Sequence, residues 1–444
     1  MTENARINTA RKPPGHIQHM LYGCFLFFMP FTQALTFSVG FPLKFSELAL
    51  ILLSFHYILY GRKVSLPRPV IYLLSFLFVI VTLSVIINLF WDYAYPLRLF
   101  ETRFGYKGDS ISRYVYFILA LLSFFISVDI FLADHVRYLR FWVYGALLAA
   151  AISWYLCIFS FLRLPVFLLP GMNIPPQIIW AFGRPIIRCG TFLEGNMMGL
   201  YLVLSAAICF YIKKRKAGIF LLASVISTFS TLSIACVFIF LFIYFQQYIF
   251  QRKTMIFAFP GLVLLIILFV LFSQTTIYKN YVYDKVFANT EKITDNSSYS
   301  KADRIFSIRD AFMMGVANPI LGVGLANYAL HYNNYMDRGN LDANFVKILS
   351  RENIRVIPNN IYMEIWSESG AIALILFLIL MTLLLFYARS DHRRALFPAM
   401  LCMVLCFNAY PSFIMIYLWS FMALPVAEYI RRSREDSGKH IPTI

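Results

Sequence analysis

The chain has 444 residues, of which 60% are hydrophobic and only 14% are charged, and its formal net charge is +17. Soluble domains contain roughly 25% charged residues, so this chain lacks the polar surface that a water-soluble fold requires. Apolar runs of the ~20 residues that a spanning helix needs recur from end to end. The runs are continuous rather than alternating, which favours helices over a membrane β-barrel. The composition predicts an all-α fold, a polytopic membrane helix bundle.

The apolar runs predict about 12 transmembrane helices. The division of 217–250 into two spans rests on a weak break at Ser230-Thr231-Leu232-Ser233, and Pro411 supports a break in the last apolar stretch. The expected spans are 20–38, 41–60, 70–91, 113–133, 141–162, 195–212, 217–232, 233–250, 255–273, 359–387, 395–409 and 412–430.

Basic clusters follow every second expected span. Short loops rich in Lys and Arg stay in the cytoplasm, so the tails 1–19 and 431–444 are both expected there. The first tail lacks a small-residue cleavage site after a short apolar core, which argues against a signal peptide. The clusters are Arg62-Lys63, Arg137 with Arg140, Lys213-Lys214-Arg215-Lys216, Arg252-Lys253, Arg393-Arg394, and Arg431-Arg432 with Arg434.

The segments expected on the outer side are longer. The largest, 274–358, separates the expected spans of 20–273 from those of 359–430. A connection of this length is usually functional or disordered. We expect a large outer loop bearing short helices around Tyr299–Gly315 and Leu341–Glu352.

Arginine is frequent in these outer segments. Long exported loops escape the charge rule, so a solvated basic face is one explanation. The other is an anionic ligand, because guanidinium groups match phosphate oxygens well. A nucleic acid is not expected at such a site. The arginines are Arg103, Arg113, Arg184, Arg188, Arg304, Arg309, Arg351 and Arg355.

Three motifs fall on the outer side in a fixed order. The first is Arg188-Cys189-Gly190-Thr191-Phe192-Leu193-Glu194-Gly195-Asn196, directly before a span. The second combines Arg304 and Arg309 with Asn318-Pro319-Ile320-Leu321-Gly322-Val323-Gly324-Leu325-Ala326-Asn327-Tyr328. The third, Asn359-Asn360-Ile361-Tyr362-Met363-Glu364-Ile365-Trp366-Ser367-Glu368-Ser369-Gly370, opens the span after the large loop.

Together the three motifs resemble the O-antigen ligase and O-antigen polymerase superfamily of bacterial membrane glycosyltransferases. The resemblance covers residues 180–390 by motif and the whole chain by span number and loop placement. It implies a multi-pass enzyme of the bacterial cytoplasmic membrane that acts at the outer face. The donor would be a glycan on a polyprenyl pyrophosphate, and the acceptor another lipid-linked glycan or lipid A core. It also implies catalysis without a metal or cofactor, in keeping with a sequence that has no outer Asp-x-Asp pair.

The resemblance places Arg188 and Arg304 at the positions of functional arginines. Fixed guanidinium groups would stabilise the charge that develops on the pyrophosphate leaving group, with Arg309 as a second-line binding residue. The structural alternative is that the two arginines snorkel to lipid headgroups or pair with Glu194 or Asp303.

A base for the acceptor hydroxyl is harder to assign. The ligases carry His before Asn at the head of the third motif, whereas this chain has Asn359 followed by Asn360. A neutral Asn can orient a hydroxyl but cannot take its proton, which favours a polymerase-like member.

The remaining candidates are His331 and three carboxylates. Glu364 and Glu368 lie four residues apart and so share a helix face, and a carboxylate near the membrane is a functional candidate. Glu368 is equally explained as a ligand of loop backbone. Glu194 is the third carboxylate.

One arginine of the family pattern is missing. Related sequences often read Thr-x-Ser-Arg where this chain has Thr231-Leu232-Ser233-Ile234. Arg184 or Arg309 could take its place in space.

Two alternatives to a repeat-unit polymerase remain. One is the ligase, and the other is a transporter or flippase for lipid-linked oligosaccharides. Transporters usually bind at the midplane between paired repeats, whereas the polar residues here gather at the outer face. A chain-length regulator is a further possible partner of a polymerase.

Overall fold

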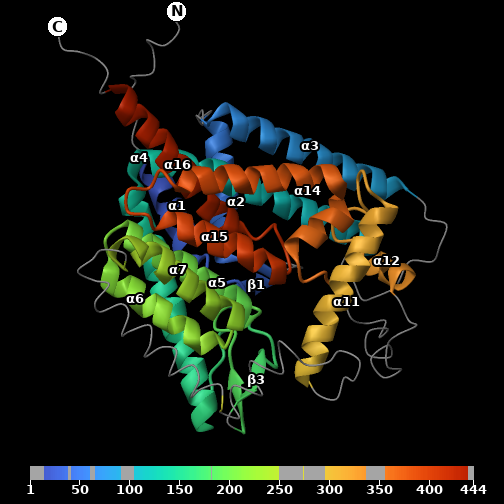
Figure 1. Ribbon diagram of the computed structural model, residues 1–444, viewed down its shortest axis with the longest axis horizontal. Helices are drawn as coiled ribbons and strands as arrows, with labels where there is room; N and C mark the ends of the chain where they lie inside the picture. Colours follow the sequence, from blue (N-terminus) through green and yellow to red (C-terminus); the bar gives the residue numbers. More distant parts are fainter. Residues whose placement is uncertain are drawn as a thin grey trace, which may run out of the picture.

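The computed structural model describes residues 15–38, 42–60, 66–91, 105–181, 183–249, 274, 296–336 and 356–438. This part of the chain is a helical bundle with two small antiparallel ribbons (Figure 1). Its helices are α1 (His16–Phe28), α2 (Phe45–Leu59), α3 (Arg68–Phe90), α4 (Gly105–Leu162), α5 (Gly195–Tyr211), α6 (Arg215–Ser224), η1 (Val225–Thr228), α7 (Thr231–Ile249), α11 (Asn296–Ala317), α12 (Tyr328–Tyr335), α14 (Ile361–Ala388), α15 (Leu396–Cys406), η3 (Phe407–Ala409) and α16 (Ile416–Gly438). Its strands are β1 (Thr36–Ser38), β2 (Pro42–Lys44), β3 (Ile178–Ala181) and β4 (Arg184–Ile187).

The helices bear out the predicted class of protein. Within the described residues, α3, α4 and α14 are long and apolar enough to cross a membrane, and α2, α5, α7 and α15 are shorter apolar helices. The expected span 255–273 and the expected helix 341–352 lie outside the described residues. The number of about 12 spans therefore stays a prediction.

Two expected pairs of spans differ in how they are joined. The spans 113–133 and 141–162 lie in α4, which consists of two helices joined directly across a kink at Asp134. The break expected near Ser230 is present, because Phe229 has a left-handed φ of 47° between η1 and α7.

The first expected span is shorter than predicted. Helix α1 ends at Phe28, and the chain then reaches the ribbon in which Thr36 pairs with Lys44. Pro30 has no N–H to continue the helix. Hydropathy does not register this end because residues 29–35 are themselves mostly apolar.

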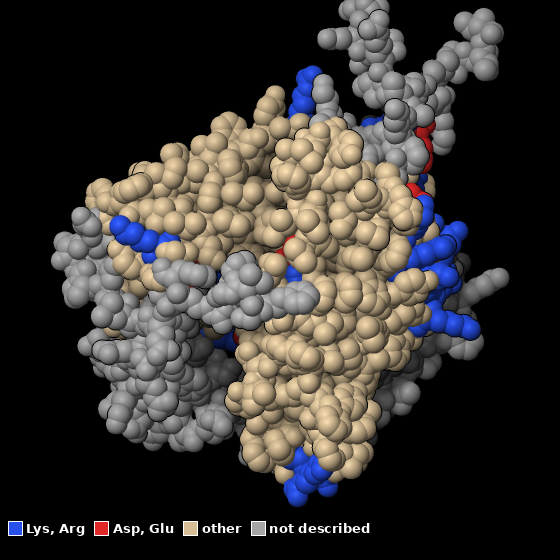
Figure 2. Space-filling model, turned by 180° about the vertical axis from the view of Figure 1, so that it is seen from behind, with Lys and Arg blue, Asp and Glu red and all other residues tan. Residues whose placement is uncertain are grey.

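Aromatic side chains fill the centre of the bundle. The rings of Trp142 and Tyr201 stack at 5.6 Å, and Trp142 donates a 2.8 Å hydrogen bond to Ser205. Large apolar side chains on the outward face of α3, such as Phe76, are exposed, as expected for a surface in contact with lipid. Figure 2 shows a broad face almost without charge, with Lys and Arg mostly at its margins.

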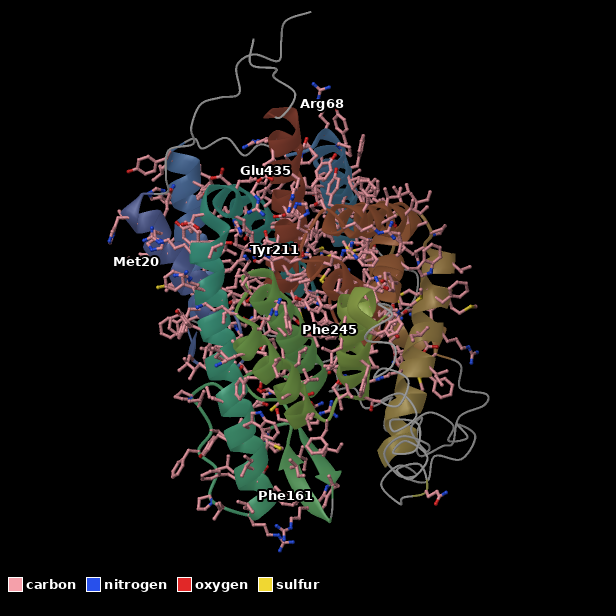
Figure 3. All side chains as sticks on the ribbon, turned by 60° about the vertical axis from the view of Figure 1, so that its left-hand side comes forward. Met20, Arg68, Phe161, Tyr211, Phe245 and Glu435 are labelled. Carbon is pink, nitrogen blue, oxygen red and sulfur yellow. The ribbon has the colours of Figure 1, made fainter. Side chains whose placement is uncertain are left out.

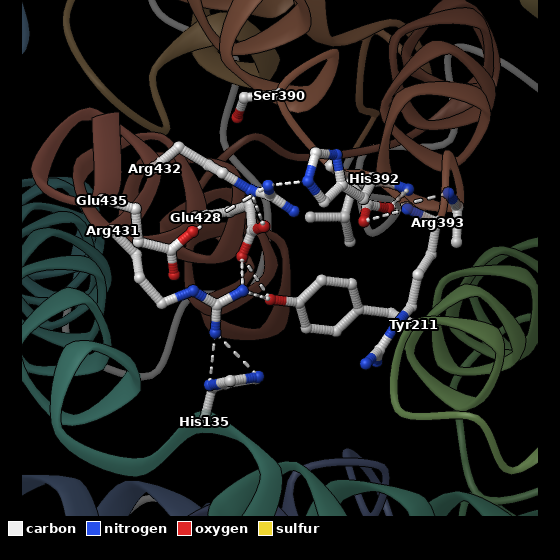
Figure 4. A network of polar contacts seen from close by, with 12 residues as sticks. His135, Tyr211, Ser390, His392, Arg393, Glu428, Arg431, Arg432 and Glu435 are labelled. Carbon is white, nitrogen blue, oxygen red and sulfur yellow. Dashed lines mark hydrogen bonds and ion pairs between the residues drawn. The ribbon is translucent and has the colours of Figure 1, made fainter. Parts of the chain in front are cut away.

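The two ends of the bundle differ. Glu435 of α16 and Arg68 of α3 lie near the end at which the chain termini emerge, and Phe161 of α4 lies at the opposite end (Figure 3). At the terminal end, buried Glu428 accepts hydrogen bonds from Tyr211 at 2.6 Å and from Arg432 at 3.2 Å (Figure 4). The contact with Tyr211 joins α16 to α5.

Candidate functional site

The β3–β4 ribbon presents the first motif to the start of α5. Arg188 follows β4, and its backbone N–H donates to the Gln177 carbonyl at 3.1 Å. The Gln177 side chain accepts the N–H of Gly195 at 2.7 Å. Gln177 thereby fixes both ends of the turn between Arg188 and α5.

The Arg188 guanidinium lies against the first turn of α5. Its Nη2 donates to Asn196 Oδ1 at 3.0 Å, and its Nε is buried without a hydrogen-bond partner among the described residues. A Cβ at Gly195 would stand 2.5 Å from that Nε, so the absence of a side chain there makes room for the guanidinium. A buried, partly unsatisfied cation is costly unless a ligand or counter-charge meets it.

Arg304 comes to the same place from a distant part of the chain. It lies half-buried on α11, which packs on the first part of α14 where Trp366 covers Gly315. Trp366 also donates to the Phe312 carbonyl at 3.0 Å. Burial lowers the pKa of Arg188, Glu194 raises it, and the charge of Arg304 lowers it. The two arginines and Glu194 are therefore electrostatic neighbours although 116 positions separate Arg188 from Arg304.

Glu194 completes this cluster. It occupies the position before α5 without capping the helix, and its carboxylate accepts no hydrogen bond from the described residues. Burial raises the pKa of the Glu194 carboxyl above its ordinary 4.5, while Arg304 and then Arg188 lower it. The net direction is upward, so this carboxylate is a stronger base than one in water.

The second and third motifs interlock in one unit. Helix α14 is broken at Gly370, whose φ of 82° lies in the left-handed region, and Ala371 then donates to the Pro319 carbonyl at 2.7 Å. A Cβ at Gly370 would stand 2.2 Å from the Ile320 carbonyl oxygen. Ser84 of α3 joins the two segments, donating to the carbonyls of Leu321 and Glu368 at 2.6 and 2.9 Å.

Glu368 belongs to this interlocking unit. Its two carboxylate oxygens accept the N–H groups of Ala326 and Tyr328 at 2.9 and 3.3 Å. The explanation as a ligand of loop backbone therefore fits its geometry. Asn360 caps α14, since its side chain accepts the Met363 N–H at 3.1 Å. Asn359 precedes it with a φ of 50°, a conformation that Asn tolerates.

Glu364 is buried and paired. Arg113 of α4 donates from one nitrogen to Glu364 at 2.9 Å and to Ser412 at 2.7 Å, and the Phe413 N–H reaches the other Glu364 oxygen at 2.9 Å. Helices α4 and α14 are thereby tied to the segment before α16.

The other two predicted residues lie elsewhere. Arg309 is on an exposed face of α11. His331 is fully buried in α12, and burial lowers its pKa from 6.5 to about 4. It is therefore neutral at pH 7, and its surroundings include the buried cluster of Ala311, Met314 and Tyr328 that holds α12 on α11.

The segment that lacks the arginine of the family pattern lies next to the first motif. Thr228 and Ser233 pack against Gly195 and Gly199 at the start of α5, so the altered segment borders the first motif. Arg184 does not reach it from β4, because its Nη1 donates to the Phe161 carbonyl at 2.6 Å at the far end of α4. Among the described residues, Arg188 and Arg304 are the cations beside Glu194 at this place.

A cavity of about 270 Å³ lies beside the first motif. Its wall includes Phe192 and Leu193, the two residues before Glu194. The polar lining that sequence reasoning missed includes Lys44, Glu47, Tyr116 and Gln33. The sequence contains one indication of this cavity, the single carboxylate Glu47 in the apolar run that starts at Phe45, because an ionisable residue in such a run is a functional candidate.

The described residues hold no group of three or more His, Cys, Asp or Glu that could bind a metal ion. What they do hold is an apolar helical bundle with a cluster of two arginines and a carboxylate at one end of it. Such a fold is that of a membrane protein, and such a cluster offers two cations beside one carboxylate.

Comparison with known proteins shows a similarity to one family over part of the chain. Residues 216–378 match the family model Wzy_C, described as O-Antigen ligase. The match contains Arg304, the loop around Gly322 and Gly324 (the glycine loop) and the break of α14 at Gly370, whereas Arg188 and Glu194 lie before it. It confirms the resemblance to the O-antigen ligase and polymerase superfamily, and it supports a bacterial membrane glycosyltransferase of that type. No curated protein matches the chain.

Proposed function

We propose that this protein polymerises oligosaccharide repeat units carried on a polyprenyl pyrophosphate, at the outer face of the bacterial cytoplasmic membrane. The product would be an O-antigen, capsule or exopolysaccharide. The observation that carries the proposal is the electrostatic cluster of Arg188, Arg304 and Glu194, within a chain whose residues 216–378 match the O-antigen ligase family.

The arginines would act on the leaving group. In the transfer step, the bond between the anomeric carbon and the phosphate oxygen breaks, and its electron pair stays on that oxygen. Two fixed guanidinium groups in a half-buried site stabilise the new charge because the site need not reorganise as water would. No step requires a metal or a cofactor in this scheme.

Glu194 would serve the acceptor. The acceptor hydroxyl oxygen forms the new glycosidic bond, and its proton passes to a base. Among the three candidate carboxylates, Glu364 accepts from Arg113 and Phe413, and Glu368 accepts from two backbone N–H groups. The Glu194 carboxylate accepts none from the described residues and lies beside both arginines. Asn359 and Asn360 remain candidates for orienting the acceptor, and the exposed Arg309 remains a candidate for binding it, whereas His331 is fully buried.

A ligase is the second candidate function, because the matched family is described as O-Antigen ligase. The two activities differ only in the acceptor, which is a second lipid-linked glycan for a polymerase and lipid A core for a ligase. Asn359 at the position of the ligases' histidine favours the polymerase. A chain-length regulator is then the expected protein partner.

The test is a transfer assay on purified protein. Wild type, Arg188→Ala, Arg304→Ala and the control Arg140→Ala receive a polyprenyl-pyrophosphate repeat unit, and product length is followed on a gel. Arg140 is exposed on α4 and lies outside the cluster.

We expect a ladder from wild type and from the control, and a loss of ~10²–10³-fold in rate for each cluster variant. Transfer only to added lipid A core would identify a ligase. Movement of lipid-linked glycan across vesicles without any joining would instead show a transporter. Full activity of folded cluster variants would refute the role of the arginines.

A further inference from the structure

The cavity beside the first motif has a polar wall built around one carboxylate. Glu47 is 2% exposed, and its oxygens accept from the Lys44 backbone N–H at 3.1 Å and from the Tyr116 hydroxyl at 3.2 Å. The Lys44 ammonium lies 2.5 Å from the other oxygen. Because three donors, two from Lys44 before α2 and one from Tyr116 of α4, hold it, the Glu47 carboxylate has a fixed direction.

Donors and acceptors around this carboxylate are left available. Arg113 uses only Nη2 in its hydrogen bonds within the described residues, so Nη1 and Nε are free on a side chain that lines the cavity. The Gln33 side chain also lines it, and no hydrogen bond engages its amide in the part of the chain that the structure describes. A ligand with several hydroxyls would find both donors and acceptors here.

The charges of the cavity balance. Lys44 pairs with Glu47, and Arg113 pairs with Glu364, so two cations meet two carboxylates. This differs from the cluster of Arg188, Arg304 and Glu194, in which cations are in excess. Of the two carboxylates only Glu47 lines the cavity. Because both cations are already paired and the Glu47 carboxylate forms part of the wall, a phosphate would be disfavoured there, whereas a neutral ligand would not.

Aromatic side chains supply the remaining wall. Tyr116, Phe192 and Tyr417 line the cavity, and their rings offer flat apolar surface beside the polar groups. Ring faces next to carboxylate, amide and guanidinium groups suit a sugar, which presents C–H faces and hydroxyl edges. The volume of about 270 Å³ lies just below the ~300–1,000 Å³ of ordinary small-molecule pockets, so one or two sugar rings would fill it.

The cavity and the arginine cluster share the first motif as a wall. Phe192 and Leu193 face the cavity, and Glu194 follows them in the chain beside the arginines. Tyr417 of the cavity contacts the Tyr410 hydroxyl, which also donates to the Met197 carbonyl at 3.2 Å. A sugar in the cavity would therefore lie next to the carboxylate that we propose as the base.

We infer that this cavity binds the accepting sugar of the glycan acceptor, with Glu47, Arg113 and Gln33 bonding its hydroxyls. The inference rests on the proposed function for its role in transfer. Sugar binding by itself does not require that function.

The first experiment measures binding without catalysis. Repeat-unit oligosaccharide, released from its lipid by mild acid, is titrated into detergent-purified protein in a calorimeter. The variants are Glu47→Gln, Gln33→Ala and the cavity-filling Gln33→Trp. The two Gln33 variants leave the Lys44–Glu47 pair intact, so they still test the inference if Glu47→Gln fails to fold. Glu435→Gln, on the exposed end of α16, is the matched carboxylate control.

We expect wild type and the control to bind the oligosaccharide, and the three variants to bind it at least tenfold more weakly. Inorganic pyrophosphate should not displace it. Unchanged binding in all three variants, no binding by wild type at millimolar oligosaccharide, or displacement by pyrophosphate would each overturn the inference.

The transfer assay then separates this inference from the proposed function. We expect the cavity variants to raise the KM for the acceptor tenfold or more and to leave the KM for the donor unchanged. Cavity-dependent binding by a wild type that joins no glycans would contradict the polymerase and leave the sugar site standing. Normal transfer with an unchanged acceptor KM would reject the role of the cavity in transfer.

Discussion

The carboxylate of Glu368 accepts the backbone N–H of Ala326 at 2.9 Å, across 42 positions of the chain. The third motif thus holds the loop of the second, and a residue that resembles a catalytic carboxylate stabilises the glycine loop. Because the loop follows directly after α11 in the chain, this contact helps to fix α11, the helix that carries Arg304.

Replacing Glu368 with Gln should destabilise the protein. The amide can accept only one of the two N–H groups, and its own NH₂ would face the other. We expect a loss of ~1–3 kcal/mol, seen as a lower Tm in detergent, with transfer activity per folded molecule largely kept. A variant with unchanged Tm and abolished transfer would show that Glu368 is catalytic after all.

Gly195→Ala should disable the arginine cluster without removing a charge. The new methyl would stand 2.5 Å from Arg188 Nε and 2.7 Å from the Thr228 carbonyl oxygen, so the guanidinium must move. We expect transfer to fall by ~10²-fold. Gly15→Ala is the control, because no atom lies within 4 Å of a Cβ there. Equal activity of the two variants would mean that the position of Arg188 does not matter.

Glu194→Gln should change the pH dependence of transfer. A base works in its deprotonated form, and burial raises the pKa of Glu194 above 4.5. The wild-type rate should therefore rise with pH through that raised pKa. In Glu194→Gln the rate should be at least ~10²-fold lower and should lose this acidic limb. An acidic limb that persists unchanged in the variant would assign the base to another group.

The contact between Gly315 and Trp366 should control the placement of Arg304. A Cβ at Gly315 would stand 2.0 Å from the Trp366 ring nitrogen, so Gly315→Ala should push α11 away from α14. We expect a cost of ~1–3 kcal/mol in stability and a loss of transfer. The double variant Gly315→Ala with Trp366→Ala removes the clash and should recover part of both. A double variant no better than the single one would show that the clash is not the cause.

His331 should make stability depend on pH. Its folded pKa is about 4, below the 6.5 of the unfolded chain, so the unfolded state binds more protons between these values. Stability should therefore fall as the pH drops from about 6.5 toward 4, by on the order of 3 kcal/mol in full. His331→Phe should flatten this dependence of Tm on pH, whereas His16→Phe at the exposed start of α1 should not. Identical pH profiles for wild type and His331→Phe would refute the assignment.

Hydrophobic patterning by itself determined the class of protein and most helix positions. Continuous apolar runs predict α3, α5 and α15 nearly to their ends, because burial in lipid depends on local composition. The sequence also singled out Arg188, Arg304 and Glu194 as candidate residues. The expected helix at 299–315 is present as the longer α11.

Only the tertiary structure decided how these residues are grouped. Sequence treats Glu194, Glu364 and Glu368 alike, but packing leaves the first beside two arginines, ties the second to Arg113, and sets the third under the glycine loop. The break at Gly370 and the cavity around Glu47 depend on segments far apart in the chain. Hydropathy and motif spacing are local properties, whereas hydrogen-bond partners are chosen by the packing of distant helices.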